Sequence, residues 1–225
     1  MVIRRIGQSA YSTWATSALR RANDRHPWSH NDVFHTWITT QLPDLRADAL
    51  DVGCGRGELL AVLAERFERV HGTDADAEMR RVSAARCAGL PNVTVDATQL
   101  DDMPAESADL VTMIAVLHHL DLRTALLQVR EILRPAGRFA CVGLARPETV
   151  NDHAWEVASM VTNPIIGFAQ HPWAAPEPPD REPFPVRDPQ VTFGELRSAL
   201  ADVMPGAQLR HRLGFRHTIA WTKPG

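Results

Sequence analysis

The residue pattern with the clearest chemical meaning is a glycine-rich turn in the first third of the chain. An apolar run ends near Asp51, and glycines then occupy positions 53, 55 and 57 before a helical pattern begins. Glycine has no Cβ, so the backbone can turn sharply there and approach a ligand closely. The free amides at the start of the following helix point back at the same turn. A strand, a G-x-G-x-G turn and a helix in this order predict a site for a nucleotide-like ligand.

The glycine spacing and the charge of this turn narrow the choice of ligand. The dinucleotide fingerprint G-x-G-x-x-G needs its third glycine one residue later than Gly57. The Asp51 carboxylate would repel a pyrophosphate but attract a cation such as an ammonium or a sulfonium group. The pattern therefore favours S-adenosylmethionine (SAM) over NAD.

Acidic residues also end the next two predicted strands. Asp74 lies 23 residues after Asp51, and a carboxylate near that separation can accept hydrogen bonds from both hydroxyls of a ribose. Alternatively Asp74 caps the following helix, although Asp76 is better placed for that role. Asp96 ends the third strand, where it either contacts a ligand or simply starts a turn.

Two adjacent histidines, His118 and His119, follow the fourth predicted strand. Ligands bind at the carboxyl ends of the strands in open α/β sheets, so both imidazoles are predicted near the ligand. Because imidazole titrates near neutral pH, each histidine is a candidate general base. The alternative is that at least one of them only holds the loop by a hydrogen bond to the backbone.

The elements that must position these residues alternate between short apolar runs and helical patterns. Strands are predicted near 47–52, 69–73, 92–96, 108–116 and 137–144, and helices near 58–68, 76–88 and 122–133. This alternation predicts a parallel sheet with helices on both faces. A further helix over 191–203 precedes two strands, 207–212 and 215–222, which form a terminal hairpin. The hairpin is locally basic, and its charged residues are expected mostly on one solvated face, although an acidic substrate could also bind there: Arg210, His211, Arg212, Arg216 and His217.

Two segments lie outside this alternation. Residues 1–45 show helical spacing only and are predicted to form a helical lid, while 46–225 form the ligand-binding domain. A Pro-rich insertion at about 147–190 has seven prolines between 171 and 190, and it is expected to pack back on the domain rather than to act as a free linker. Lid residues with aromatic or imidazole side chains are candidate substrate contacts: Tyr11, Trp14, His26, Trp28 and His30. Their spacing does not indicate a metal site.

Composition bounds the remaining possibilities. The 225 residues are 44% apolar and 23% charged, with a net charge of −3, which gives no general attraction to nucleic acid or to an anionic membrane. Three unpaired-looking cysteines indicate neither a disulfide framework nor a zinc site, and they suit a reducing cytoplasm. No stretch approaches the ~20 apolar residues of a membrane span. We expect a cytoplasmic protein with a small-molecule partner.

These segments together resemble the class I SAM-dependent methyltransferase superfamily over about 47–145. The family's first motif is an acidic residue followed by G-x-G-x-G, as in this turn. Leu-His-His-Leu at 117–120 resembles the small-molecule branch of the ubiquinone/menaquinone-methyltransferase type. It does not resemble the Asn/Asp-Pro-Pro-Tyr/Phe motif of amide and adenine N-methyltransferases. Residues 133–139 resemble the family's Leu-(Arg/Lys)-Pro-Gly-Gly, with Ala136 replacing the first glycine.

The resemblance implies a Rossmann-like, doubly wound α/β fold with a mostly parallel sheet and a C-terminal antiparallel hairpin. It implies methyl transfer from SAM to a small, apolar or aromatic acceptor, with Asp96 accepting from the adenine amino group and the next backbone amide donating to the ring. Two alternatives are a SAM-binding protein without catalysis and an NAD(P)-dependent oxidoreductase. The residues that the resemblance assigns to SAM are Asp51, Gly53, Cys54, Gly55, Gly57, Asp74, Asp96, Ala97 and Ala115.

Overall fold

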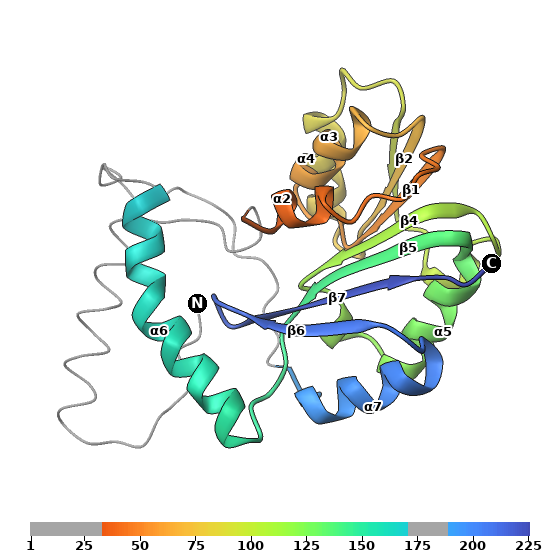
Figure 1. The fold of residues 1–225 in the computed structure, drawn as a ribbon. Helices are drawn as coiled ribbons and strands as arrows, with labels where there is room; N and C mark the ends of the chain where they lie inside the picture. Colours follow the sequence, from red (N-terminus) through yellow and green to blue (C-terminus); the bar gives the residue numbers. More distant parts are fainter. Residues whose placement is uncertain (1–32, 171–188) are drawn as a thin grey trace.

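A seven-stranded sheet forms the centre of the molecule, as a computed structural model of residues 33–170 and 189–225 shows (Figure 1). The strands are β1 (Asp48–Val52), β2 (Arg69–Thr73), β3 (Val93–Asp96), β4 (Ala108–Ile114), β5 (Leu133–Gly143), β6 (Gln208–Arg212) and β7 (Arg216–Thr222). Their order is β3-β2-β1-β4-β5-β7-β6. Strands β1 to β5 are parallel, and β7 is antiparallel to both of its neighbours. The predicted fold class and the terminal hairpin are therefore confirmed.

Helices cover both faces of this sheet (Figure 1). They are α2 (Val33–Thr39), α3 (Glu58–Ala64), α4 (Ala77–Arg86), α5 (Leu122–Ile132), α6 (Val150–Gln170) and α7 (Phe193–Val203), with short 3-10 turns η1 (Leu100–Asp102) and η2 (Leu117–His119). One buried cluster joins α2 and α3 to one face, and a second joins α5 and α7 to the other. With both faces covered, a ligand can reach the sheet where the parallel strands end. We call this row of carboxyl ends the edge of the sheet.

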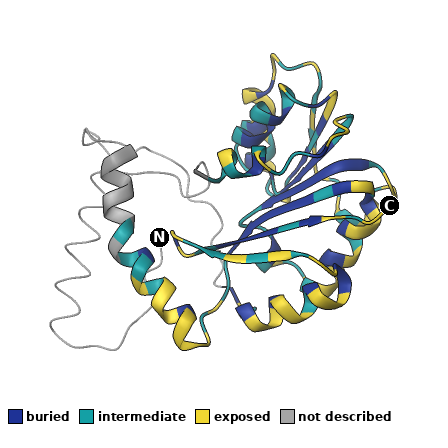
Figure 2. Ribbon diagram, viewed as in Figure 1, coloured by how far each residue is buried: buried dark blue, intermediate teal, exposed yellow. Residues whose placement is uncertain are grey.

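Strand β4 shows why the sheet is central. Its residues from Ala108 to Met113 are all buried, and alternate side chains enter the two clusters: Val111 packs on the α5 side, and Leu110 on the α3 side. A strand buried on both faces needs a nearly continuous apolar run. Figure 2 shows this burial as a dark core between helices whose outer faces are exposed.

Polar side chains fix where three of the helices begin. Asp76 accepts hydrogen bonds from the backbone N–H groups of Glu78 and Met79 at the start of α4. Asp121 caps α5 in the same way through Thr124. Thr192 and Glu195 form a reciprocal capping box at the start of α7. The prediction that Asp76, rather than Asp74, caps α4 is confirmed.

The boundaries of some elements differ from the prediction. Helix α3 ends at Ala64 rather than near 68, and β5 begins at Leu133 rather than near 137. The strand starts early because Leu133 pairs with Ala108, and the chain then continues through Ala136, whose φ is +63°. Helix α6 occupies the first part of the predicted insertion.

Much of the predicted lid lies outside the described residues. This applies to Tyr11, Trp14, His26, Trp28 and His30, and to the Pro-rich stretch 171–188. Of the N-terminal segment, α2 is described, and its Ile38 is fully buried in the cluster that also contains α3. In the ranges described, no helix combines the length and the apolar character needed to cross a membrane.

Candidate SAM and acceptor site

The glycine turn lies at the carboxyl end of β1 and is tied to β2. The backbone N–H groups of Gly53 and Cys54 both donate to the carbonyl oxygen of Thr73, at 2.7 and 2.9 Å. All three glycines of the motif have positive φ, between 55° and 77°, a region that side chains disfavour. A Cβ on Gly53 would lie 2.2 Å from Cγ2 of Val116. The turn therefore requires glycine for its backbone conformation and for close packing against the loop after β4.

Two carboxylates flank this turn. Asp51 is 3% exposed, and its Oδ1 accepts a hydrogen bond from the Thr112 hydroxyl at 2.7 Å. The Asp74 oxygens accept from the backbone N–H groups of Gly55 and Asp76, each at 2.9 Å. Among the residues that the structure describes, no lysine or arginine forms an ion pair with either carboxylate.

Burial shifts the acidity of Asp51 strongly. Its pKa is raised from 3.8 to about 7, chiefly by removal from water and further by the negative charge of Asp74, while the Thr112 hydrogen bond acts in the opposite direction. A buried acidic group near another carboxylate, without a basic side chain to compensate, favours a cation in the space beside it. The two carboxylates therefore fit the positively charged methionine part of SAM and do not fit a pyrophosphate.

At the end of β3, Asp96 lies on the same edge of the sheet. Its Oδ1 accepts from the Thr98 backbone N–H at 2.8 Å and lies 3.0 Å from Nε2 of His71. Burial raises the pKa of Asp96, but the Thr98 hydrogen bonds and the His71 imidazole outweigh it and hold the pKa below its ordinary value. Asp96 and Ala97 are both exposed, so a ligand can reach them.

The loop after β4 approaches the glycine turn from the other side. Ala115 has φ +59°, and its N–H donates to the Val142 carbonyl at 2.7 Å, which places Val116 against Gly53. The loop continues into η2, where the rings of His118 and His119 lie 4.0 Å apart. His118 is half-buried and His119 is exposed.

Sequence reasoning missed the groups that hold the predicted acids in place. Thr112 contacts Asp51 because the two are partners in the β1–β4 register. The available signal was a single hydroxyl in an otherwise apolar strand. His71 beside Asp96 and Ser83 beside Cys54 (3.7 Å between Sγ and Oγ) come from other strands and helices, and no local pattern indicates them.

The terminal hairpin corrects one expectation. Its basic residues do not share one solvated face, because alternate residues of β6 and β7 point to opposite faces of the sheet. The arginines Arg212 and Arg216 face each other on one side, whereas His211 and His217 pair on the other. His217 is buried, and His211 stacks on the Phe193 ring at 3.7 Å between centroids.

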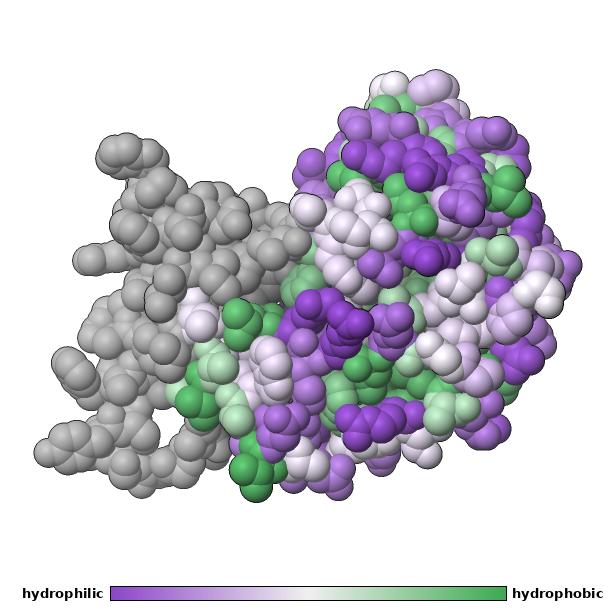
Figure 3. Space-filling view, viewed as in Figure 1, coloured by the Kyte–Doolittle hydropathy of each residue, from purple (hydrophilic) through white to green (hydrophobic). Residues whose placement is uncertain are grey.

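Helix α6 docks on this hairpin. Nε2 of His211 lies 3.3 Å from Oδ1 of Asp152, and the Ser159 hydroxyl accepts from the backbone N–H of Phe215 at 3.2 Å. Exposed apolar side chains gather on α6 and the hairpin turn, including Val157 and Phe215. Figure 3 shows apolar residues in this area, while the α3–α4 half of the same view is mostly polar.

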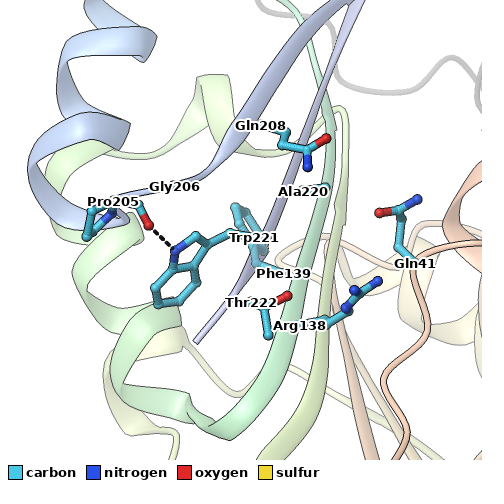
Figure 4. A pocket seen from close by; sticks show the side chains of 9 residues that line it. All are labelled: Gln41, Arg138, Phe139, Pro205, Gly206, Gln208, Ala220, Trp221 and Thr222. Carbon is cyan, nitrogen blue, oxygen red and sulfur yellow. Dashed lines mark hydrogen bonds between the residues drawn. The ribbon is translucent and has the colours of Figure 1, made fainter. Parts of the chain in front are cut away.

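A groove of about 240 Å³ lies elsewhere, beside the middle of β5 and the end of β7 (Figure 4). Gln41, Arg138 and Trp221 are among its lining residues, and the Trp221 indole N–H donates to the Pro205 carbonyl at 3.0 Å. None of its lining residues belongs to the glycine turn or to the loop after β4. It is therefore separate from the site described above.

Comparison with known proteins defines the class. A family model described as a methyltransferase domain matches residues 50–141. An uncharacterized methyltransferase of Mycobacterium tuberculosis is 32% identical over 201 residues, covering 88% of this chain and 98% of the relative. A ubiquinone/menaquinone biosynthesis C-methyltransferase of Rubrivivax gelatinosus is 25% identical over 145 residues, covering 63% and 55% of the two chains.

A solved structure shows the same fold. Geranyl diphosphate C-methyltransferase from Streptomyces coelicolor, in complex with S-adenosyl-L-homocysteine (SAH), superposes with a TM-score of 0.58 at 13% identity and covers 85% of this chain and 77% of its own. The chain therefore belongs to the class I SAM-dependent methyltransferases. It is an enzyme, and its cofactor is SAM.

Proposed function

We propose that this methyltransferase transfers the methyl group of SAM to a small molecule with an apolar or aromatic body, bound at the carboxyl ends of β4 and β5. The observation that carries the proposal is the buried Asp51 and the half-buried Asp74 beside three glycines of positive φ, at the same edge as His118. Two relatives support a small acceptor by name, one acting on geranyl diphosphate and one in ubiquinone/menaquinone biosynthesis.

Each predicted cofactor residue has a role that its position allows. Asp51 and the turn from Gly53 through Cys54 to Gly57 would hold the charged methionine part. Each carboxylate oxygen of Asp74 accepts one backbone hydrogen bond, and a carboxylate oxygen can accept a second. Asp74 can therefore accept from both ribose hydroxyls without losing its present partners.

The remaining contacts lie further along the edge. The exposed Asp96 carboxylate and the Ala97 backbone would take the adenine, and the left-handed turn at Ala115 would bring the β4 loop against the cofactor. SAM supplies a methyl group on a positively charged sulfur. The protein's contribution is to align the acceptor with that methyl group, and such alignment is worth roughly 7–11 kcal/mol of barrier lowering.

Proton removal remains a prediction for His118 and His119. His118 is half-buried and His119 is exposed, so the two single substitutions to Gln would separate their roles. Acceptor contact by the aromatic and imidazole residues of 1–32 also remains a prediction.

The test first measures binding of the cofactor to the protein and then screens acceptors for methyl transfer. We expect the wild-type chain to bind SAM and SAH in calorimetry, and to transfer radiolabelled methyl from SAM to at least one small apolar or aromatic compound. Gly55→Val should abolish SAM binding, because a branched side chain at φ +55° strains the turn and fills the ligand's space.

The matched control is Gly89→Val. Gly89 is exposed, and a Cβ there would have no neighbour within 4 Å. Equal loss of SAM affinity in both variants, or transfer only to macromolecules, would refute the proposal.

A further inference from the structure

His217, near the start of β7, is a buried polar side chain that the fold leaves unsatisfied. It is 3% exposed, and neither ring nitrogen has a hydrogen-bond partner among the residues that the structure describes. A buried polar atom without a partner destabilises a fold, and most are paired in native proteins. Such an atom therefore needs an explanation.

The register of the sheet places this ring at the edge where ligands bind. His217 lies opposite Gly143, the last residue of β5, whose carboxyl end belongs to that edge. A Cβ on Gly143 would lie 2.5 Å from Nε2 of His217. Because Gly143 has no side chain, the His217 imidazole can lie directly against the backbone of β5 at this position. The Phe193 ring contributes an edge-to-face contact at 6.3 Å.

Packing alone does not require an imidazole here. The next residues of β7 that point to the same face are Ile219 and Trp221, both buried in the α5–α7 cluster. An apolar side chain at position 217 would continue that pattern without leaving two nitrogens unpaired. The polar ring interrupts the apolar series only at the carboxyl end of β5.

The charge state of the ring restricts its partner. Burial is the main reason why the pKa of His217 is lowered to about 3, and the nearby Arg216 contributes to the same shift. The ring is therefore neutral near neutral pH, with one nitrogen as donor and the other as acceptor. A cationic ammonium group can only donate hydrogen bonds, so it cannot pair with the N–H of the ring. In the described ranges, the nearby acids and histidines form no group of three that could hold a metal ion.

We infer that His217 is the hydrogen-bond anchor of the acceptor subsite and takes a neutral hydroxyl group of the acceptor. The inference rests on the proposed function. A hydroxyl both donates and accepts, which matches a neutral imidazole, whereas an ammonium leaves the ring N–H unpaired and an apolar group leaves both nitrogens unpaired. The acceptor class is thus an alcohol or a phenol carried on an apolar body.

The experiment uses the full chain loaded with SAH and labelled with ¹⁵N-histidine. In NMR spectra, the ring-nitrogen resonances of His217 are those that are absent from the H217F variant. These resonances are then followed during separate titrations with phenol, toluene and benzoate. We expect phenol to move them saturably, with an affinity about tenfold above that of toluene. The exposed imidazole of His153 serves as the internal control and should not respond.

Three results would overturn the inference. They are equal responses to phenol and toluene, no response to phenol, and a preference for benzoate accompanied by protonation of the ring, which would show an anion subsite. Calorimetric binding of SAH, measured first, separates the two proposals. Without SAH binding the proposed function fails, whereas SAH binding without a His217 response refutes the hydroxyl anchor alone.

Thermal unfolding supplies a second measurement. If the ring nitrogens have no internal partners, the Tm of H217F or of H217L should equal or exceed that of the wild type, because the apolar ring or chain removes two unsatisfied atoms. A Tm lower by more than about 5 °C in both variants, or failure of both to fold, would show that the imidazole is a structural group and would overturn the inference.

Discussion

Asp51→Asn tests the electrostatics of the cofactor site most directly. The pKa of Asp51 is about 7 in the folded chain against an ordinary 3.8. Between pH 3.8 and about 7, the Asp51 carboxyl group is therefore protonated in the folded chain and ionised in the unfolded chain. The resulting stabilisation is complete below about pH 3.8 and is lost as the pH rises to about 7, so the ionised carboxylate opposes folding at higher pH.

The magnitude follows from the two pKa values. Each pH unit between 3.8 and about 7 corresponds to about 1.4 kcal/mol, so ionising Asp51 in the fold costs at most about 4 kcal/mol. Asn has the same shape and no charge, and its oxygen can still accept from Thr112. The variant should therefore be more stable than the wild type near pH 8 by up to about 4 kcal/mol, or roughly 10 °C in Tm. The difference should vanish towards about pH 4.

The assay is denaturant unfolding of both proteins across this pH range, with SAM affinity measured by calorimetry on the same samples. The variant should bind SAM about 10- to 100-fold more weakly near pH 8, because it loses a charged partner for the cation. Asp121→Asn is the control. It removes the same charge from an exposed helix cap, where Asn caps equally well. A stability difference that does not grow with pH, or unchanged SAM affinity, would refute the reasoning.

Three further substitutions test other parts of the site. Gly53→Ala should destabilise the fold and weaken SAH binding, since its Cβ would lie 2.2 Å from Val116 Cγ2 at φ +69°; Val116→Ala should restore part of the Tm, and no restoration would contradict the steric cause. Asp74→Ala should weaken SAM by about 1.5–3 kcal/mol but leave a 2′,3′-dideoxyribose analogue nearly unaffected in calorimetry; equal losses would make Asp74 purely structural. Thr192→Ala should lower the free energy of unfolding by about 0.5–2 kcal/mol without changing SAM affinity, and a changed affinity would mean that α7 reaches the cofactor.

The fold was predictable where local pattern and tertiary environment agree. The nearly continuous apolar run of β4 predicts a strand buried on both faces, and the three glycines predict a sharp backbone turn after β1. The structure shows both, and the three glycines of the turn have positive φ. The start of β5 was not predictable, because it depends on pairing between Leu133 and a strand 25 residues earlier. Helix α6 was not predicted either.

The candidate site divides in the same way. The acids at the strand ends follow from their positions in the chain, since successive parallel strands bring their carboxyl ends to one edge. Their partners do not follow, because Thr112 is 61 residues from Asp51. The opposite faces of His217 and Arg216 follow from the alternation of side chains along a strand, which the expectation of one solvated face overlooked. That the His217 face is buried depends on the packing of α7 and could not be predicted from the hairpin alone.

The two ends of the site differ in charge. The glycine turn has two carboxylates without a basic partner among the described residues, whereas the β5–β7 end has a buried imidazole that is neutral near neutral pH. Under the proposed function, this difference favours the cationic cofactor at the glycine turn and a neutral acceptor beside His217. If Asp51 and Asp74 lie beside the sulfonium as proposed, loss of the methyl group removes the positive charge that they attract, and their contribution to binding is smaller for SAH than for SAM.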